Sequence, residues 1–199
     1  MRRALPVAAT VAALALLVGG CASNPELASG KSRAQAAGVN AQLAMAYLQL
    51  GKLAVARHFI ERALSEDSDE ATVQAAAGVI YERLGEAGKA RRAYTEAARL
   101  AQGDPNVMNA YAGYLCRNHQ ASEGEKVFRE VIRNPLYQTP EVAMVNAGVC
   151  LENAGDDQGA ENYFKRALVV KPNMPEAMLE TGALAMRRKD PAAAADVVR

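Results

Sequence analysis

Three observations on the 199-residue chain predict an all-α fold, a solenoid of stacked helical hairpins. A small residue recurs at steps of 34, 34, 36 and 34 residues, and an apolar or aromatic residue follows four places later in the first four copies. A glycine stands five places before it in three copies, and no stretch alternates as strands do. The recurring small residues are Ala56, Ala90, Gly124, Ala160 and Ala194. Such repetition is typical of solenoids, whose extended surfaces bind other proteins.

The first twenty residues have the organisation of an export signal. Two arginines precede the apolar stretch Leu5–Val18, which is shorter than the roughly 20 residues that span a bilayer. The ending Gly19-Gly20-Cys21 resembles a bacterial lipobox, in which the cysteine is acylated and becomes the first mature residue. Two or more acyl chains on Cys21 would anchor the chain durably. The alternative is an ordinary secretory signal that contains a cysteine.

The residues after Cys21 predict the destination and the attachment. Ala22 and Ser23 follow, without an aspartate, and by resemblance to known sorting signals this favours the outer membrane, with the chain lipid-anchored and facing the periplasm. Residues 21–36 contain Pro25 and Gly30 and are expected to form a flexible, lipidated tether. The repeat domain is then expected over residues 37–199.

Charge argues against two classes of partner. Without the two N-terminal arginines, 21 basic residues face 22 acidic ones, a formal charge of −1. A chain so nearly balanced lacks the basic surface that binds nucleic acid or a polybasic patch for anionic lipid.

Each repeating unit is predicted to hold two helices. If the recurring small residue is the twentieth position, the units start near residues 37, 71, 105, 141 and 175. Leu43, Ala44 and Tyr47 occupy positions seven, eight and eleven of the first unit, and the next three units repeat this apolar, small, large pattern. A spacing of four keeps positions seven and eleven on one helical face, and the small residues let two helices approach closely.

Glycine and proline punctuate the units where helices should end and begin. Gly51, Gly85 and Gly155 stand where the first helix must close in a left-handed conformation. Three pairs place a capping side chain before a proline of the first helical turn. These pairs are Asp104-Pro105, Thr139-Pro140 and Asp190-Pro191.

Two units depart from the pattern. The third has His119 in place of the glycine, which suggests a different closure, and two extra residues before the fourth unit. The fifth stops at Arg199, after 25 of 34 positions, so we expect its last helix, Ala192 to Arg199, to fray. Over residues 37–199 the chain resembles the tetratricopeptide repeat, with four full repeats and a truncated fifth.

The search for catalytic or metal-binding chemistry finds little. His58 and His119 lie in different units, and no Ser-His-Asp order, phosphate-binding glycine loop or HExxH motif is present. Cys116 and His119 have a spacing that metal ligands use, but no further ligand completes the set. We therefore expect no enzyme activity, cofactor, metal or small-molecule substrate.

Cys116 and Cys150 fall near the same place in the first helices of two neighbouring units. An exported chain enters an oxidising compartment, which favours a disulfide. Two buried free thiols are the alternative, since cysteine is common in helix cores.

The first helices should line a groove on one side of the stack. In tetratricopeptide repeats, positions two, five, nine and twelve of these helices face it, and here most are apolar or neutral. The set suits an apolar helix or an extended segment, although single members can equally pack inside the stack. It includes Met45, Leu48, Val79, Asn109, Cys116, Val145 and Val149.

One stretch is more specific than the generic repeat. Residues 134–143 read NPLYQTPEVA and residues 146–150 read NAGVC. Upstream stand NAY at 109–111, LCR at 115–117 and EGE at 123–125. Together they resemble the type IV pilus biogenesis lipoproteins called PilF or PilW. That resemblance implies a pilotin, which helps secretin subunits reach the outer membrane and assemble into a ring. It makes Cys21 the anchor, the first units the secretin-binding groove, and Cys116 with Cys150 a stabilising bridge.

Two other functions are compatible with the lipobox and the solenoid. One is an envelope scaffold lipoprotein that docks peptidoglycan enzymes or other cell-envelope complexes. The other is a regulatory subunit acting on cell-wall synthesis.

Overall fold

The computed structural model describes residues 25–189, and in that range it contains nine α-helices and no strand. The all-α prediction is therefore confirmed. Cys21, the expected export signal and the final helix expected from Ala192 lie outside the described residues. The helices are α1 Pro25–Gln49, α2 Leu53–Glu66, α3 Ala71–Arg83, α4 Ala87–Leu100, α5 Pro105–Arg117, α6 Ala121–Arg133, α7 Pro140–Asn153, α8 Asp157–Val170 and α9 Pro175–Arg187.

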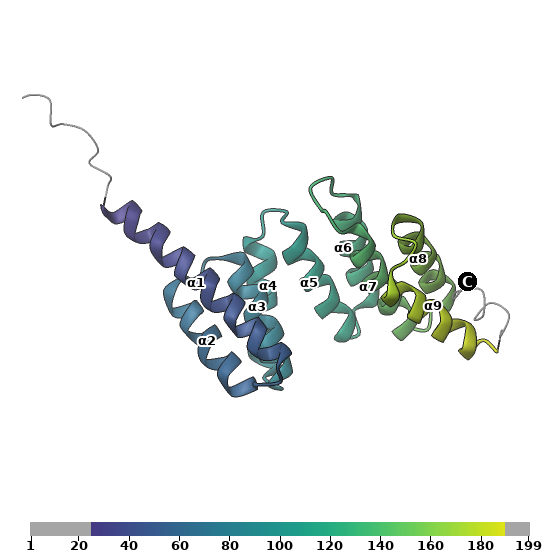
Figure 1. The fold of residues 1–199 in the computed structure, drawn as a ribbon, viewed down its shortest axis with the longest axis horizontal. Helices are drawn as coiled ribbons and strands as arrows, with labels where there is room; N and C mark the ends of the chain where they lie inside the picture. Colours follow the sequence, from purple (N-terminus) through teal and green to yellow (C-terminus); the bar gives the residue numbers. More distant parts are fainter. Residues whose placement is uncertain (1–24, 190–199) are drawn as a thin grey trace, which may run out of the picture.

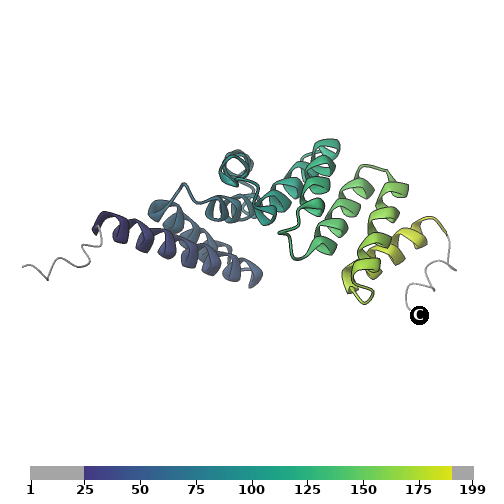
Figure 2. The ribbon, with the colours of Figure 1, turned by 90° about the horizontal axis from the view of Figure 1, so that it is seen from above.

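The helices pair in sequence order and the pairs follow one another along the long axis of the molecule (Figure 1). α1 and α2, α3 and α4, α5 and α6, and α7 and α8 form the hairpins, and α9 begins a fifth. Each second helix also packs against the first helix of the following hairpin, and successive first helices lie side by side. The view from above shows the same elongated row (Figure 2). The stack is the superhelical solenoid that the pitch predicted.

The core consists of the residues at the repeating positions. The residues four places after the small ones, Ile60, Tyr94, Phe128 and Phe164, are all fully buried. Close helix approach is what buries them: a Cβ added to Gly78 would lie 2.8 Å from ring carbons of Tyr94, and one added to Gly148 would overlap the ring of Phe164. A small residue at position eight thus makes room for the aromatic residue of the second helix.

The buried residues form two main clusters along the stack. One lies in α1 to α4, the other in α5 to α9. Between them a smaller cluster of Ala75, Ala97, Ala101 and Val107 joins α3 and α4 to α5. Small side chains therefore make up most of this joint.

The turn in the third unit closes like the others. Gly51, Gly85 and Gly155 have positive φ angles of 71°, 73° and 86°, and His119 takes the same left-handed conformation with φ 61°. Its backbone N–H donates to the Cys116 carbonyl at 3.1 Å, as Gly85 donates to Glu82 at 3.0 Å. The suggestion of a different closure at His119 was wrong.

Two boundaries differ from the sequence prediction. α1 starts at Pro25, so residues 25–36, expected as a flexible tether, are helical. Alanines favour a helix there, and the packed second half of α1 supplies the nucleus from which the helix extends outward. α7 begins at Pro140, one residue before the predicted unit start. Across residues 25–189, no helix combines the length and apolarity needed to cross a membrane.

Candidate functional site

The first helices α3, α5 and α7 enclose a hollow of about 620 Å³, which we call the α3–α5–α7 groove. Val79 of α3 and Val149 of α7 line its sides. Asn109 and Gly113 line it from α5, between the other two helices. Because three units contribute one helix each, the groove exists only through their stacking.

The structure brings together only part of the set expected to line a groove. Val79, Asn109, Val149 and Cys116 do line it. Met45 and Leu48 do not: they are half-buried and pack against the core cluster of α1 to α4, because α1 is covered by both α2 and α3.

Val145 is also misplaced by the sequence prediction. It is buried in the cluster of α5 to α9. Counting one unit onward from Asn109 leads to Val145, but the residue that faces the groove at this level is the next one, Asn146. The one sequence signal for Asn146 was that it is a polar residue directly after Val145. The two-residue insertion before α7 obscured which residue of α7 corresponds to Asn109 of α5.

Two asparagines form a polar patch in the groove. The side-chain amide of Asn146 donates a hydrogen bond from Nδ2 to Oδ1 of Asn109, at 3.3 Å. Each amide has two donors and an acceptor with two lone pairs, so this one bond leaves the Nδ2 of Asn109 and the Oδ1 of Asn146 free for a ligand. The groove is thus less apolar than the sequence suggested.

An ion pair closes the gap between α3 and α5. Arg117 donates to the Glu82 carboxylate through Nε and Nη2, both at 2.8 Å. The Tyr94 hydroxyl donates to Glu82 at 3.1 Å and accepts from Arg117 at 3.3 Å. Burial, and next the nearby Glu82 carboxylate, raise the pKa of the Tyr94 phenol well above its ordinary value, so the hydroxyl stays protonated and keeps donating.

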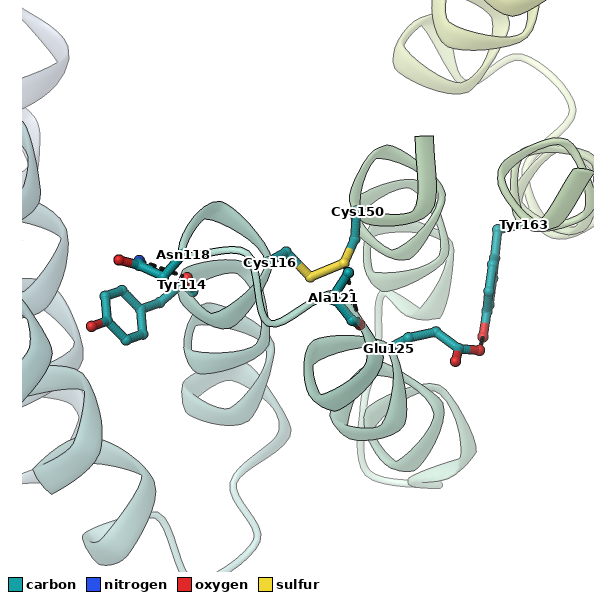
Figure 3. Close-up of a disulfide and its surroundings, with 7 residues drawn as sticks. All are labelled: Tyr114, Cys116, Asn118, Ala121, Glu125, Cys150 and Tyr163. Carbon is teal, nitrogen blue, oxygen red and sulfur yellow. Dashed lines mark hydrogen bonds between the residues drawn. A yellow bond between two sulfur atoms is a disulfide. The ribbon is translucent and has the colours of Figure 1, made fainter. Parts of the chain in front are cut away.

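A disulfide closes the next gap, between α5 and α7. It joins Cys116 to Cys150, whose Cα atoms lie 5.3 Å apart (Figure 3). Figure 3 also shows the Tyr163 hydroxyl, which donates to Glu125 at 3.0 Å and links α8 to α6. The ion pair and the disulfide both lie near the C-terminal ends of first helices, and together they set the width of the groove.

The chemistry of the groove suits binding. Two valines, three asparagine amides and Arg83 line it, and the Arg117–Glu82 ion pair beside them is already satisfied. His58 lies on α2 and His119 in the turn after α5, on different hairpins. Across the part of the chain that the structure describes, no three His, Cys, Asp or Glu residues gather as a metal would need.

A family model described as the tetratricopeptide repeat matches residues 41–105 and 151–199. The chain belongs to the tetratricopeptide repeat family. Proteins of this kind are generally non-enzymatic scaffolds that mediate contacts between proteins.

Two pilus proteins are similar to this tetratricopeptide repeat chain over most of its length. The type IV pilus assembly protein PilF of Pseudomonas aeruginosa is 26% identical over 186 residues, covering 92% of this chain and 74% of PilF. The crystal structure of PilW, a widely conserved type IV pilus biogenesis factor, matches with a TM-score of 0.74 and 28% identity, over 82% of this chain and 74% of PilW. A structure of Pseudomonas aeruginosa PilF matches with a TM-score of 0.72 and 25% identity, over 83% and 75%.

Proposed function

We propose that this chain is a pilotin: an outer-membrane lipoprotein adaptor for type IV pilus biogenesis that assists the localisation of the secretin and the assembly of its multimer. The observation that carries the proposal is the similarity to PilF over 92% of the chain, together with the fold it shares with PilW. That similarity supports a role in type IV pilus biogenesis, and the pilotin activity is the finer step that we add.

The expected lipid anchor suits such an adaptor. Cys21 precedes Pro25, the first residue of α1, by only four residues. Holding the adaptor at a membrane raises its effective concentration for a client bound to the same membrane. Because α1 is helical from Pro25, it would present the repeat stack at a defined distance from the lipid.

The groove supplies a preformed surface for the client. The bidentate Arg117–Glu82 pair and the disulfide hold α3, α5 and α7 at set spacings before any partner arrives. A site that is already ordered loses little conformational entropy on binding, so more of the contact energy appears as affinity.

Gene deletion and complementation test the proposal. Deletion is expected to abolish twitching motility and the heat-resistant secretin multimer, and the wild-type gene should restore both. Cys21→Ser should fail to restore them if the anchor is required, and fractionation of the envelope measures where the variant resides. If the deletion strain keeps its secretin multimers but has an altered cell shape or wall composition, the chain is an envelope scaffold and the pilotin proposal is wrong.

A direct test uses purified secretin. The full chain in detergent should bind it in a pull-down and accelerate its assembly into multimers on gels. If the purified chain leaves the rate of secretin multimer formation unchanged, the proposal is contradicted, whatever effect the gene deletion has on motility.

A further inference from the structure

We propose that two copies of this chain associate through α1, with the exposed faces of their two α1 helices packed side by side in parallel. The direction of the pairing rests on the proposed function, because it follows from the lipid anchor that precedes α1 in each copy. Three features carry the inference: an exposed helix face without charges, a residue spacing typical of paired helices, and the place where the rest of the chain joins α1.

The exposed face of α1 carries no charged residue along most of its length. Within residues 25–189 only α2 and α3 pack against α1, which lies at one end of the row of hairpins (Figure 1). From Ala34 to Leu50 the sequence contains no Asp, Glu, Lys or Arg, and the exposed side chains are those of glutamine, valine, leucine and alanine. The terminal units of a solenoid need a polar outer face to stay soluble. An uncharged end face is therefore a candidate contact surface.

The exposed face of α6 shows the contrast. Its exposed side chains include five charged ones, Glu123, Lys126, Arg129, Glu130 and Arg133. A face of that kind stays in water, so the absence of charge on α1 is a property of this helix and not of the whole stack.

A stripe of apolar residues on α1 has the spacing of a helix pair, and we call it the α1 seam. It consists of Ala36, Val39, Leu43, Ala46 and Leu50, at steps of three, four, three and four residues. A mean step of 3.5 residues keeps such a seam facing a neighbouring helix over several turns. Val39 is 50% exposed and Leu50 is 67% exposed, so pairing would remove apolar surface from water.

Three glutamines lie beside the α1 seam at intervals of seven residues. Gln35, Gln42 and Gln49 are all exposed. A glutamine amide both donates and accepts hydrogen bonds, so it is complementary to a second glutamine, whereas a charged side chain repels its own copy. The face is thus complementary to itself, as the interface of a symmetric dimer must be.

A lipid surface suits this face less well than a second copy does. Helices that lie in a membrane interface have a strongly charged face, rich in lysine and arginine, next to the apolar one. The residues beside the α1 seam are glutamines instead, and their amides would lose hydrogen bonds to water on entering hydrocarbon. A second α1 helix offers apolar contact to the seam and hydrogen-bonding partners to the amides.

The place where the chain joins α1 sets the direction of the pairing. Cys21, the proposed anchor, precedes Pro25 by four residues, so the α1 helices of both copies would start at the same membrane. Two such helices that pack along their length run parallel, and each seam residue then faces its own counterpart. Residues 35–50 span about 24 Å of helix, which is a short contact. The shared membrane compensates by raising the effective concentration of one copy for the other.

Cysteine cross-linking in intact cell envelopes tests the pairing and its direction. Val39→Cys, Leu43→Cys and Leu50→Cys should each give a disulfide-linked dimer under mild oxidation, because a parallel pair brings each position against itself. Ser122→Cys, exposed on α6, is the matched control and should stay monomeric on non-reducing gels. A dimer at Leu43→Cys alone would indicate antiparallel helices and overturn the inference, as would adducts with a different protein in place of dimers.

Opposite charges at one seam position give a second readout. Leu43 is already 39% exposed, so Leu43→Glu and Leu43→Lys should unfold at the wild-type temperature. On vesicles of phosphatidylethanolamine and phosphatidylglycerol, each variant alone should dimerise at least about tenfold less than the wild-type chain, because like charges meet. Mixing the two variants should restore the dimer, measured by energy transfer between two labelled populations. Thr95→Glu, exposed on α4, is the control and should dimerise as the wild type does. No energy transfer in the wild type, or no recovery in the mixture, would overturn the inference.

The outcomes separate this inference from the proposed function. If Leu43→Glu abolishes the dimer but cells carrying it assemble normal secretin multimers, the pairing stands and secretin assembly does not depend on it. If gene deletion abolishes the multimers but the seam positions give no dimer, the pilotin proposal stands and the pairing is wrong.

Discussion

At the scale of single residues, His119 shows that a turn can keep its geometry without its usual residue. A left-handed conformation costs a residue with a Cβ roughly 1–2 kcal/mol, which glycine avoids. The hydrogen bonds of the turn, including Gln120 N–H to the Leu115 carbonyl at 2.9 Å, hold His119 there regardless. The hairpin geometry therefore overrides the preference of the residue.

We predict that His119→Gly stabilises the chain. Glycine avoids the left-handed penalty, but its greater freedom in the unfolded state costs about 0.5–1 kcal/mol. We therefore expect the free energy of unfolding, measured in urea, to rise by about 0.5–1 kcal/mol. Gly85→Ala is the reverse change at the equivalent turn, where φ is 73°, and should lose about 1 kcal/mol. A destabilised His119→Gly variant would mean that the imidazole makes a contribution the backbone geometry does not reveal.

A second prediction concerns the close approach of helices at Gly78. Its Cβ would overlap the Tyr94 ring, so Gly78→Ala should destabilise by about 1–3 kcal/mol as the core is overpacked. Gly38→Ala on α1 is the control: its Cβ meets nothing within 4 Å, and the change should stabilise by about 0.5–1 kcal/mol. Thermal unfolding measures both, and equal effects at the two glycines would contradict the packing argument.

At the scale of elements, the disulfide between α5 and α7 lines the groove and also holds the two helices together. Cys116 and Cys150 are 34 residues apart, and closing such a loop is worth roughly 3–4 kcal/mol in the chain-entropy model. Reduction, or replacing both cysteines by serine, should lower the free energy of unfolding by about that amount. The double variant should be insensitive to reductant; a wild-type chain equally insensitive to it would show that the bond does not form in solution.

The other element that departs from the regular unit is α1. It has 25 residues against 13 or 14 in the remaining helices (Figure 1). Residues 29–33, near its N-terminal end, are all exposed, so tertiary contacts do little to hold this part of the helix. The local preference of alanine and continuity with the packed half explain why this segment is helical.

At the scale of the whole molecule, the stack divides between α4 and α5. The buried cluster at this joint has four members, and three of them, Ala75, Ala97 and Ala101, are alanines; the fourth is Val107. Polar and aromatic links supplement them: the Tyr94 and Tyr114 rings stack 4.5 Å apart, beside the Arg117–Glu82 pair. In a solenoid each unit depends only on its neighbours, so a weak interface separates two folding units.

We predict that Val107→Ala uncouples the two halves. The truncation removes apolar contact at the joint, so α1 to α4 should open independently of α5 to α9, which the disulfide strengthens. In the Val107→Ala variant, hydrogen exchange should show two levels of amide protection, with the higher level in α5 to α9. Ser122→Ala, exposed on α6, is the control and should leave the exchange pattern as it is in wild type; a single protection level across α1 to α9 in Val107→Ala would contradict the division.

The sequence alone determined the class of this molecule: the repeat pitch, the helical hairpins, the large buried residue of each second helix and the proline that starts α5 and α7. These follow from local periodicity, since every unit makes the same contacts with its neighbours. Only the tertiary structure decided which side chains meet across units, such as Asn146 with Asn109 and Arg117 with Glu82. Such meetings depend on helix register and on the two residues inserted before α7, so a pattern read along one chain does not contain them.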